Sequence, residues 1–146
     1  MTEWRGYLAL LAGLFVAGCP EEDTKPCDAP VMAFRVTLNA ADGPLPPDTG
    51  LLVRHGTGNA EYHLQGLRSG TNVLFCGDRD GGQIDPNDAG KLDVLVCELW
   101  TDGAAHVTVR AKGYLTLDEQ LDAKLESGCL QTRDVQLTLE RGDAGT

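Results

Sequence analysis

Five cysteines are the residues of this chain whose type and spacing say most about its chemistry. Four of them are spread through the body of the chain, at Cys27, Cys76, Cys97 and Cys129. Zinc sites usually contain a close ligand pair such as C-x-x-C, whereas these four cysteines are 49, 21 and 32 positions apart. An even number of widely spaced cysteines in an exported chain is typical of disulfides. We therefore expect two disulfides rather than a metal centre.

The pairing of these cysteines is open, because four cysteines allow three connectivities. We favour a bond between Cys76 and Cys97, which would close a polar loop between two expected strands. Cys27 would then pair with Cys129 and tie the first strand to the last. In the chain-entropy model each bond would stabilise the fold by roughly 3–5 kcal/mol.

An acidic loop at 78–88, with the sequence DRDGGQIDPND, is the second candidate for chemistry. Calcium binds about six to eight oxygen atoms supplied by a flexible loop. The candidate ligands are Asp78, Asp80, Asp85, Asn87 and Asp88. The spacing is wrong for a calcium-binding helix-loop-helix, because Gly82 stands two positions after Asp80 and no Glu closes the loop. Asp, Asn and Gly are also common turn formers, so we favour a solvated turn and keep calcium as the alternative.

The sequence gives little support for a zinc site of histidines or for a catalytic serine. We expect the three histidines, His55, His63 and His106, at the surface rather than in a zinc site. The two serines, Ser69 and Ser127, do not lie in a G-x-S-x-G nucleophile turn. We expect Trp100 to pack in the core or against a hairpin, and an exposed aromatic platform is the alternative. The sequence therefore favours a protein that is not an enzyme.

The fifth cysteine ends an apolar segment near the N-terminus. Residues 7–17 are an almost unbroken apolar run, shorter than the roughly 20 residues that span a bilayer and typical of a secretory signal. The run ends in Val16-Ala17-Gly18-Cys19, which resembles the lipobox of bacterial lipoproteins. The resemblance implies that residues 1–18 are a signal peptide and that Cys19 becomes acylated. An ordinary signal peptide is the alternative.

The expected anchor sets the domain organisation and the location. Residues 19–30 are acidic and contain proline, so we expect a tether that holds the domain off the membrane. The domain itself would cover 31–140, followed by a flexible tail at 141–146. The expected location is the cell envelope, at the outer membrane, on its periplasmic face or at the cell surface.

Net charge excludes one class of partner. The 146 residues carry 22 acidic and 12 basic side chains, a formal charge of −10. Nucleic-acid binding requires a basic face that displaces counterions. We therefore expect no nucleic-acid partner, and we expect an envelope protein or a polysaccharide instead.

The body of the chain alternates apolar and polar residues with period two, which is typical of half-buried strands. Met32, Phe34, Val36 and Leu38 alternate with polar or small residues. The expected strands or runs are 32–39, 51–55, 61–65, 72–76, 92–100, 105–111, 114–121 and 131–139. Residues 92–100 are apolar on both faces and are expected to form a central strand. One weak helix is expected at 118–126.

Seven or eight short strands with frequent turn signals predict an all-β fold. An Ig-like β-sandwich would bury one face of each strand, and a small barrel is the alternative.

The stretch from Leu99-Trp100-Thr101-Asp102-Gly103 to Ala111-Lys112-Gly113-Tyr114 resembles the end of a carboxypeptidase regulatory-like, or transthyretin-like, module. The resemblance implies a non-catalytic appendage with a structural or binding role. The opening of the 78–88 loop, Asp-x-Asp-Gly, also resembles EF-hand and dockerin loops. The expected function is a lipid-anchored envelope β-sandwich without a cofactor. The alternatives are a calcium-dependent binding module that uses the 78–88 loop, and a small envelope enzyme or enzyme inhibitor.

Overall fold

Ten strands and one short 3-10 helix make up the described part of the chain. The structure is a computed structural model that describes residues 27, 31–66 and 72–142. The signal peptide and Cys19 lie outside these residues, as do nearly all of the tether and most of the tail. No helix within the described ranges is long and apolar enough to span a membrane.

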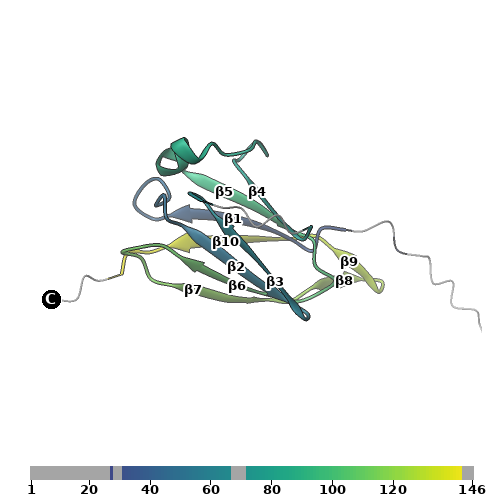
Figure 1. Cartoon of the computed structure of the whole chain (residues 1–146). Helices are drawn as coiled ribbons and strands as arrows, with labels where there is room; N and C mark the ends of the chain where they lie inside the picture. Colours follow the sequence, from purple (N-terminus) through teal and green to yellow (C-terminus); the bar gives the residue numbers. More distant parts are fainter. Residues whose placement is uncertain (1–26, 28–30, 67–71, 143–146) are drawn as a thin grey trace, which may run out of the picture.

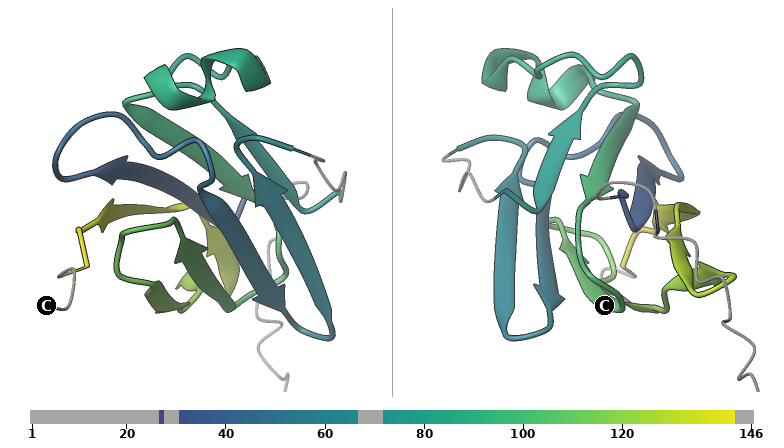
Figure 2. Two further views of the ribbon diagram at one scale, coloured as in Figure 1. Left: turned by 60° about the vertical axis from the view of Figure 1, so that its left-hand side comes forward. Right: turned by 90° about the vertical axis from the view of Figure 1, so that its right-hand side faces the viewer.

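Two four-stranded sheets pack face to face (Figures 1 and 2). Sheet A has the order β10-β1-β5-β4, with β1 at Phe34–Ala40, β4 at Leu74–Gly77, β5 at Val94–Leu99 and β10 at Arg133–Leu139. Sheet B has the order β3-β2-β6-β7, with β2 at Gly50–His55, β3 at Gly58–His63, β6 at Ala105–Arg110 and β7 at Leu117–Leu121. The predicted all-β sandwich is confirmed.

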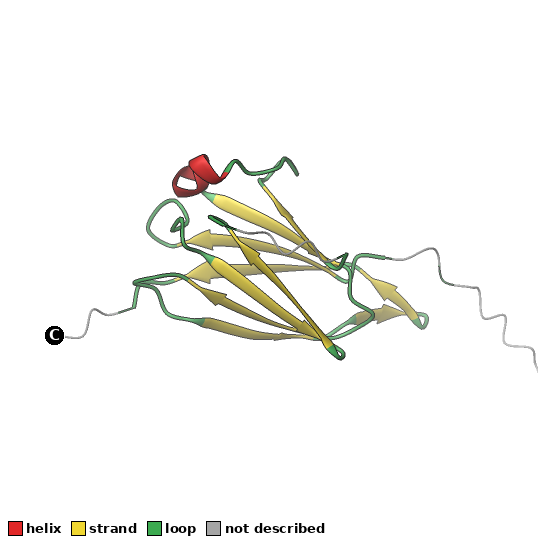
Figure 3. Ribbon diagram, in the orientation of Figure 1, coloured by secondary structure: helices red, strands yellow, loops and turns green. Residues whose placement is uncertain are grey.

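Two smaller elements lie outside the main sheets. A separate hairpin pairs β8 at Lys124–Glu126 with β9 at Cys129–Gln131. The 3-10 helix η1 at Pro86–Lys91 lies in the expected polar loop, where β5 is about to begin (Figure 3). Asp85 caps it, because the Asp85 carboxylate accepts the backbone N–H of Asn87 at 2.9 Å.

The core lies between the two sheets and follows the period-two pattern. In β1, Phe34, Val36 and Leu38 are at most 1% exposed, while Arg35 between them is exposed. On the facing sheet Val107 is fully buried. The alternation brings the apolar side chains of both sheets together in one interior. Burial of each such side chain contributes about 1.5–3 kcal/mol, which stabilises a chain that is poor in aromatic residues.

The first and last strands of the sandwich pair with each other. Their register is parallel and runs from Phe34 opposite Arg133 to Ala40 opposite Leu139. The Thr132 hydroxyl donates to the carbonyl of Met32 at 2.8 Å just before the pair begins. Every other pairing of named strands is antiparallel in the part of the chain that the structure describes.

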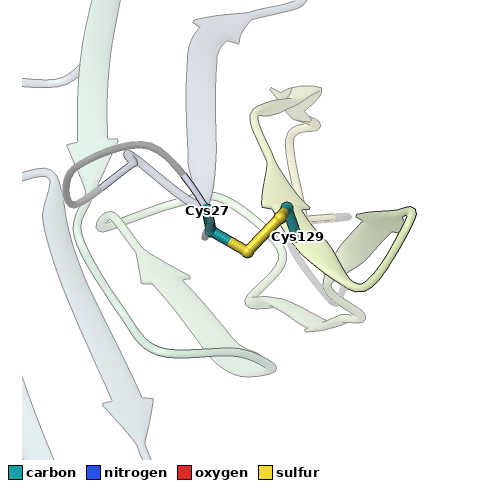
Figure 4. Close-up of a disulfide and its surroundings, with 2 residues drawn as sticks. All are labelled: Cys27 and Cys129. Carbon is teal, nitrogen blue, oxygen red and sulfur yellow. A yellow bond between two sulfur atoms is a disulfide. The ribbon is translucent and has the colours of Figure 1, made fainter. Parts of the chain in front are cut away.

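Two disulfides join the four cysteines in the pairing that the sequence favoured. Cys76 and Cys97 lie directly opposite each other on β4 and β5, with a Cα–Cα distance of 4.1 Å. Cys27 is joined to Cys129 of β9, 102 positions later (Figure 4). The second bond ties the segment before β1 to the hairpin that precedes β10.

One expected element is wrong. The helix predicted over 118–126 is replaced by β7, two residues without regular structure, and β8. β7 pairs with β6 in antiparallel register, which places Leu121 in the core. The Thr108 hydroxyl of β6 donates to the Asp118 carboxylate at 2.8 Å. Pairing with a neighbouring strand and burial of Leu121 outweigh a weak local helix propensity.

Candidate functional site

The outer face of sheet A is the side that points away from sheet B. Because side chains alternate along a strand, β1 presents Arg35, Thr37 and Asn39 on this face. The register places Val96 of β5 and Gln136 of β10 on either side of Thr37. Hydroxyl, amide and valine side chains therefore form one continuous surface across three strands.

An open depression of about 610 Å³ lies on this face. Its lining residues come from these three strands and from the loops beside them: Thr37, Asn39, Ala40, Gly43, Arg79, Asp93, Val94, Val96 and Gln136. The register pairs Asn39 with Val94 and Thr37 with Val96. These four side chains form the floor, and Arg79 and Asp93 bring one charge of each sign to the depression.

Two valines of the floor explain a pattern in the sequence. The run 92–100 is apolar on both faces, and we interpreted it as a central strand. β5 is indeed central in sheet A. However, Val94 and Val96 are half-buried and line the depression instead of packing beneath a further layer. An apolar outer face on a central strand is the sequence signal that could have located this site.

A tight turn closes one side of the depression. The Asp78 carboxylate accepts the backbone N–H groups of Asp80 at 3.0 Å and of Gly82 at 2.7 Å. The backbone of Asp78 also donates to the carbonyl of Gly82 at 3.0 Å. This carbonyl would lie 2.7 Å from a Cβ added at Gly77, so only glycine fits there. The turn therefore holds Arg79 at the edge of the floor.

Four of the five predicted calcium ligands, Asp78, Asp85, Asn87 and Asp88, use their side chains in hydrogen bonds within the loop and η1. Asp78 stabilises its turn and Asp85 caps η1, accepting both the backbone and the side-chain amide of Asn87 at 2.9 Å. Asp88 pairs with Lys91 at 2.7 Å, and this hydrogen bond raises the pKa of Lys91. Within the described ranges, no three His, Cys, Asp or Glu side chains are grouped to hold a metal ion.

Two exposed aromatic side chains lie towards the other end of the same face. Phe75 of β4 stands opposite Glu98 of β5 and is 53% exposed. Trp100 follows β5, is 37% exposed, and its indole N–H donates to Glu98 at 3.4 Å. The expectation that Trp100 packs in the core is wrong. Its backbone N–H donates to the carbonyl of Val73 at 2.8 Å, so the strand pairing fixes the side chain outside.

The histidines lie outside the core, as expected. His63 of β3 is close to Glu61, at 3.6 Å, and His106 of β6 is 3.2 Å from the Asp118 carboxylate. Both belong to the outer face of sheet B, away from the depression. His55 ends β2.

A clasp between distant segments, formed by Asp42, Tyr114 and Arg141, contains three groups whose pKa values are shifted. The Tyr114 hydroxyl donates to Asp42 at 2.7 Å, and the Arg141 guanidinium donates to the same carboxylate while lying over the Tyr114 ring. These hydrogen bonds, with that from Tyr114 the largest, lower the pKa of Asp42. The Asp42 carboxylate in turn raises the pKa of Tyr114 and of Arg141. The clasp fastens the chain end to the turn after β1.

Comparison with known proteins adds no relative: no family model matches the chain, and no curated protein or solved structure matches it.

Proposed function

We propose that this chain is a lipid-anchored, non-catalytic β-sandwich of the bacterial cell envelope, which binds a partner through the outer face of sheet A. Cys19 carries the lipid, and residues 19–30 tether the domain to the membrane. The location that fits this proposal is the outer membrane, on its periplasmic face or at the cell surface.

The observation that carries the anchor is the use of the five cysteines. The two disulfides account for Cys27, Cys76, Cys97 and Cys129, and the remaining cysteine is the one at the end of the lipobox-like Val16-Ala17-Gly18-Cys19. Disulfides persist in oxidising compartments outside the cytosol. The paired cysteines and the lipobox-like segment therefore support the same destination.

The position of the depression supports a binding role for an anchored domain. β1 starts at Phe34, near the disulfide-bonded Cys27, and runs towards Asn39. The depression is lined by residues at the far end of β1 and by Gly43 just beyond it. If the tether enters beside Cys27, the depression would lie at the end of the sandwich away from the membrane, because β1 runs from that side towards it.

The lining of the depression favours binding over catalysis. The depression offers neutral hydroxyl and amide groups, from Thr37, Asn39 and Gln136. Such groups both donate hydrogen bonds to a ligand and accept them from it. The two valines add an apolar surface. The transthyretin-like resemblance also implies a non-catalytic module, and it stays a prediction. No observation favours the calcium-dependent module or the small enzyme or inhibitor over this function.

Expression of the full chain in a bacterial host tests the anchor. We expect the protein to partition into the detergent phase, and mass spectrometry to find an N-terminal peptide that starts at Cys19 and carries added acyl mass. The Cys19→Ser variant should lose both the acyl mass and the detergent partitioning. A mature protein that starts elsewhere, or an unmodified Cys19 in the wild-type protein, contradicts the proposal.

A further inference from the structure

We propose that the outer face of sheet A binds an uncharged polysaccharide strand, which lies along β5 from the depression to the exposed aromatic residues Phe75 and Trp100. This inference rests on the proposed binding function and names the class of its ligand. It does not depend on the lipid anchor.

The polar groups of the floor match those of a sugar chain. Sugar hydroxyls both donate and accept hydrogen bonds, and so do the Thr37 hydroxyl and the side-chain amides of Asn39 and Gln136. Asn39 is positioned by its neighbour, because its amide oxygen accepts a hydrogen bond from the Thr138 hydroxyl at 3.1 Å. This bond uses the amide oxygen of Asn39, and the amide N–H₂ group is the donor that the side chain would offer to a sugar hydroxyl.

The apolar side chains of this surface match the C–H face of a sugar ring. The C–H bonds of a pyranose ring pack against apolar side chains, here Val94 and Val96. They also pack against aromatic rings, because the electron-rich ring face attracts the weakly positive hydrogens. Phe75 and Trp100 offer such rings, 53% and 37% exposed. Trp100 is held in place through its indole hydrogen bond to Glu98.

The shape of this surface suits a linear ligand. Val94, Val96, Glu98 and Trp100 follow one another on the same side of the chain. A strand rises about 3.3 Å per residue, so the track from Val94 to Trp100 is about 20 Å long. A track of this length with contacts at both ends fits several linked sugar rings better than one small molecule.

The charge of the face favours an uncharged ligand. The chain as a whole carries −10, which repels acidic polymers. On the outer face of sheet A, charges of both signs are interspersed: Arg35 lies 3.7 Å from Asp134, and the depression contains both Arg79 and Asp93. With Glu98 on the track as well, these five side chains are two basic and three acidic, so the face has no patch of one sign that would select a charged polymer.

Affinity electrophoresis of the full-length protein in mild detergent tests the inference. Native gels would contain one polymer each: soluble starch, hydroxyethyl cellulose, galactomannan, glucomannan or arabinoxylan, with the acidic polymer alginate for comparison. We expect at least one uncharged polymer to retard the wild-type protein, and alginate to leave its mobility unchanged.

Matched variants locate the binding surface. Val96→Lys places a charge in the floor of the depression, while Leu52→Lys places the same charge on the half-buried outer face of sheet B. Trp100→Ala removes an exposed apolar side chain from the track, and Leu125→Ala removes one from β8. We expect both Val96→Lys, which buries a charge under the ligand, and Trp100→Ala, which truncates a contact, to weaken binding by about tenfold or more. The two control variants should bind like wild type. Far-UV circular dichroism and thermal melting confirm that each variant is folded.

Three results overturn the inference: no uncharged polymer retards the folded wild-type protein, alginate alone retards it, or Val96→Lys and Leu52→Lys bind equally well. Each of these results leaves the anchoring of Cys19 untouched, since mass spectrometry measures that separately. Conversely, an unmodified Cys19 contradicts the proposed envelope anchor without changing the gel result. If no polymer retards the protein, and the wild-type protein but not Val96→Lys co-purifies with another protein, the ligand is a protein and the polysaccharide inference is wrong.

Discussion

Removal of the Cys27–Cys129 disulfide should destabilise the domain more through the unfolded chain than through lost contacts. The bond closes a loop of 102 positions, whereas the Cys76–Cys97 bond closes one of 21. In the chain-entropy model these loops correspond to about 4.7 and about 3.3 kcal/mol at room temperature. Cys27 is exposed and Cys129 half-buried, so the change to alanine costs little packing. The expected loss for Cys27→Ala/Cys129→Ala is therefore about 4–5 kcal/mol, a large share of a typical domain stability of about 5–15 kcal/mol.

Urea denaturation followed by far-UV circular dichroism measures this loss. The double variant should show a lower midpoint and a larger m-value, because its unfolded chain exposes more surface. Cys76→Ala/Cys97→Ala is the comparison, and it carries an added packing loss because Cys97 is 1% exposed. A loss below about 1 kcal/mol for Cys27→Ala/Cys129→Ala, with an unchanged m-value, would refute the loop-closure reasoning. Such a result would mean that the two segments are already held together in the unfolded chain as well as in the folded domain.

Three further predictions concern the clasp, the acidic loop and the core. The lowered pKa of Asp42 means that its contribution to stability is complete above its unfolded-state pKa and is lost as the pH falls through its lower folded-state value. Melting temperatures of wild type and Asp42→Asn should therefore differ at neutral pH and converge in acid, and a constant difference would contradict the clasp. Millimolar calcium should leave the melting temperature unchanged, since a ligand bound only by the folded state would raise it. Asp78→Ala should lower the stability by about 1 kcal/mol with or without calcium, because the turn loses its side-chain hydrogen bonds. Leu38→Ala, at a position 1% exposed, should cost about 2–5 kcal/mol in chemical denaturation. Thr37→Ala on the opposite face of the same strand should cost far less, and equal losses would contradict the assignment of faces.

Period-two alternation was enough to predict the sandwich. Phe34, Val36 and Leu38 alternate with residues that face solvent, and each is buried where the pattern placed it. The favoured disulfide pairing followed from the expected order of strands, because Cys76 and Cys97 border one loop and lie on neighbouring strands.

Other features depend on tertiary contacts that a single segment does not encode. Residues 118–126 contain acidic and long side chains that suit a helix, yet β7 pairs with β6 and β8 pairs with β9. Trp100 looks like a core residue by type, and only the register of β4 and β5 shows that it lies on the outer face. The depression needs the pairing of β1, β5 and β10 at once. The sequence contained one sign of it, the apolar outer face of Val94 and Val96.

The parallel pairing of β1 with β10 has a consequence for the order in which the domain can form. β1 lies between β5 and β10 in sheet A. The backbone edge of β1 that pairs with β10 therefore stays unpaired until the chain is complete to Leu139. Contacts between segments this far apart in sequence slow folding. A chain that crosses a membrane from its N-terminus would therefore expose the edge of β1 throughout transport, and it would close the sandwich only after the last strand had emerged.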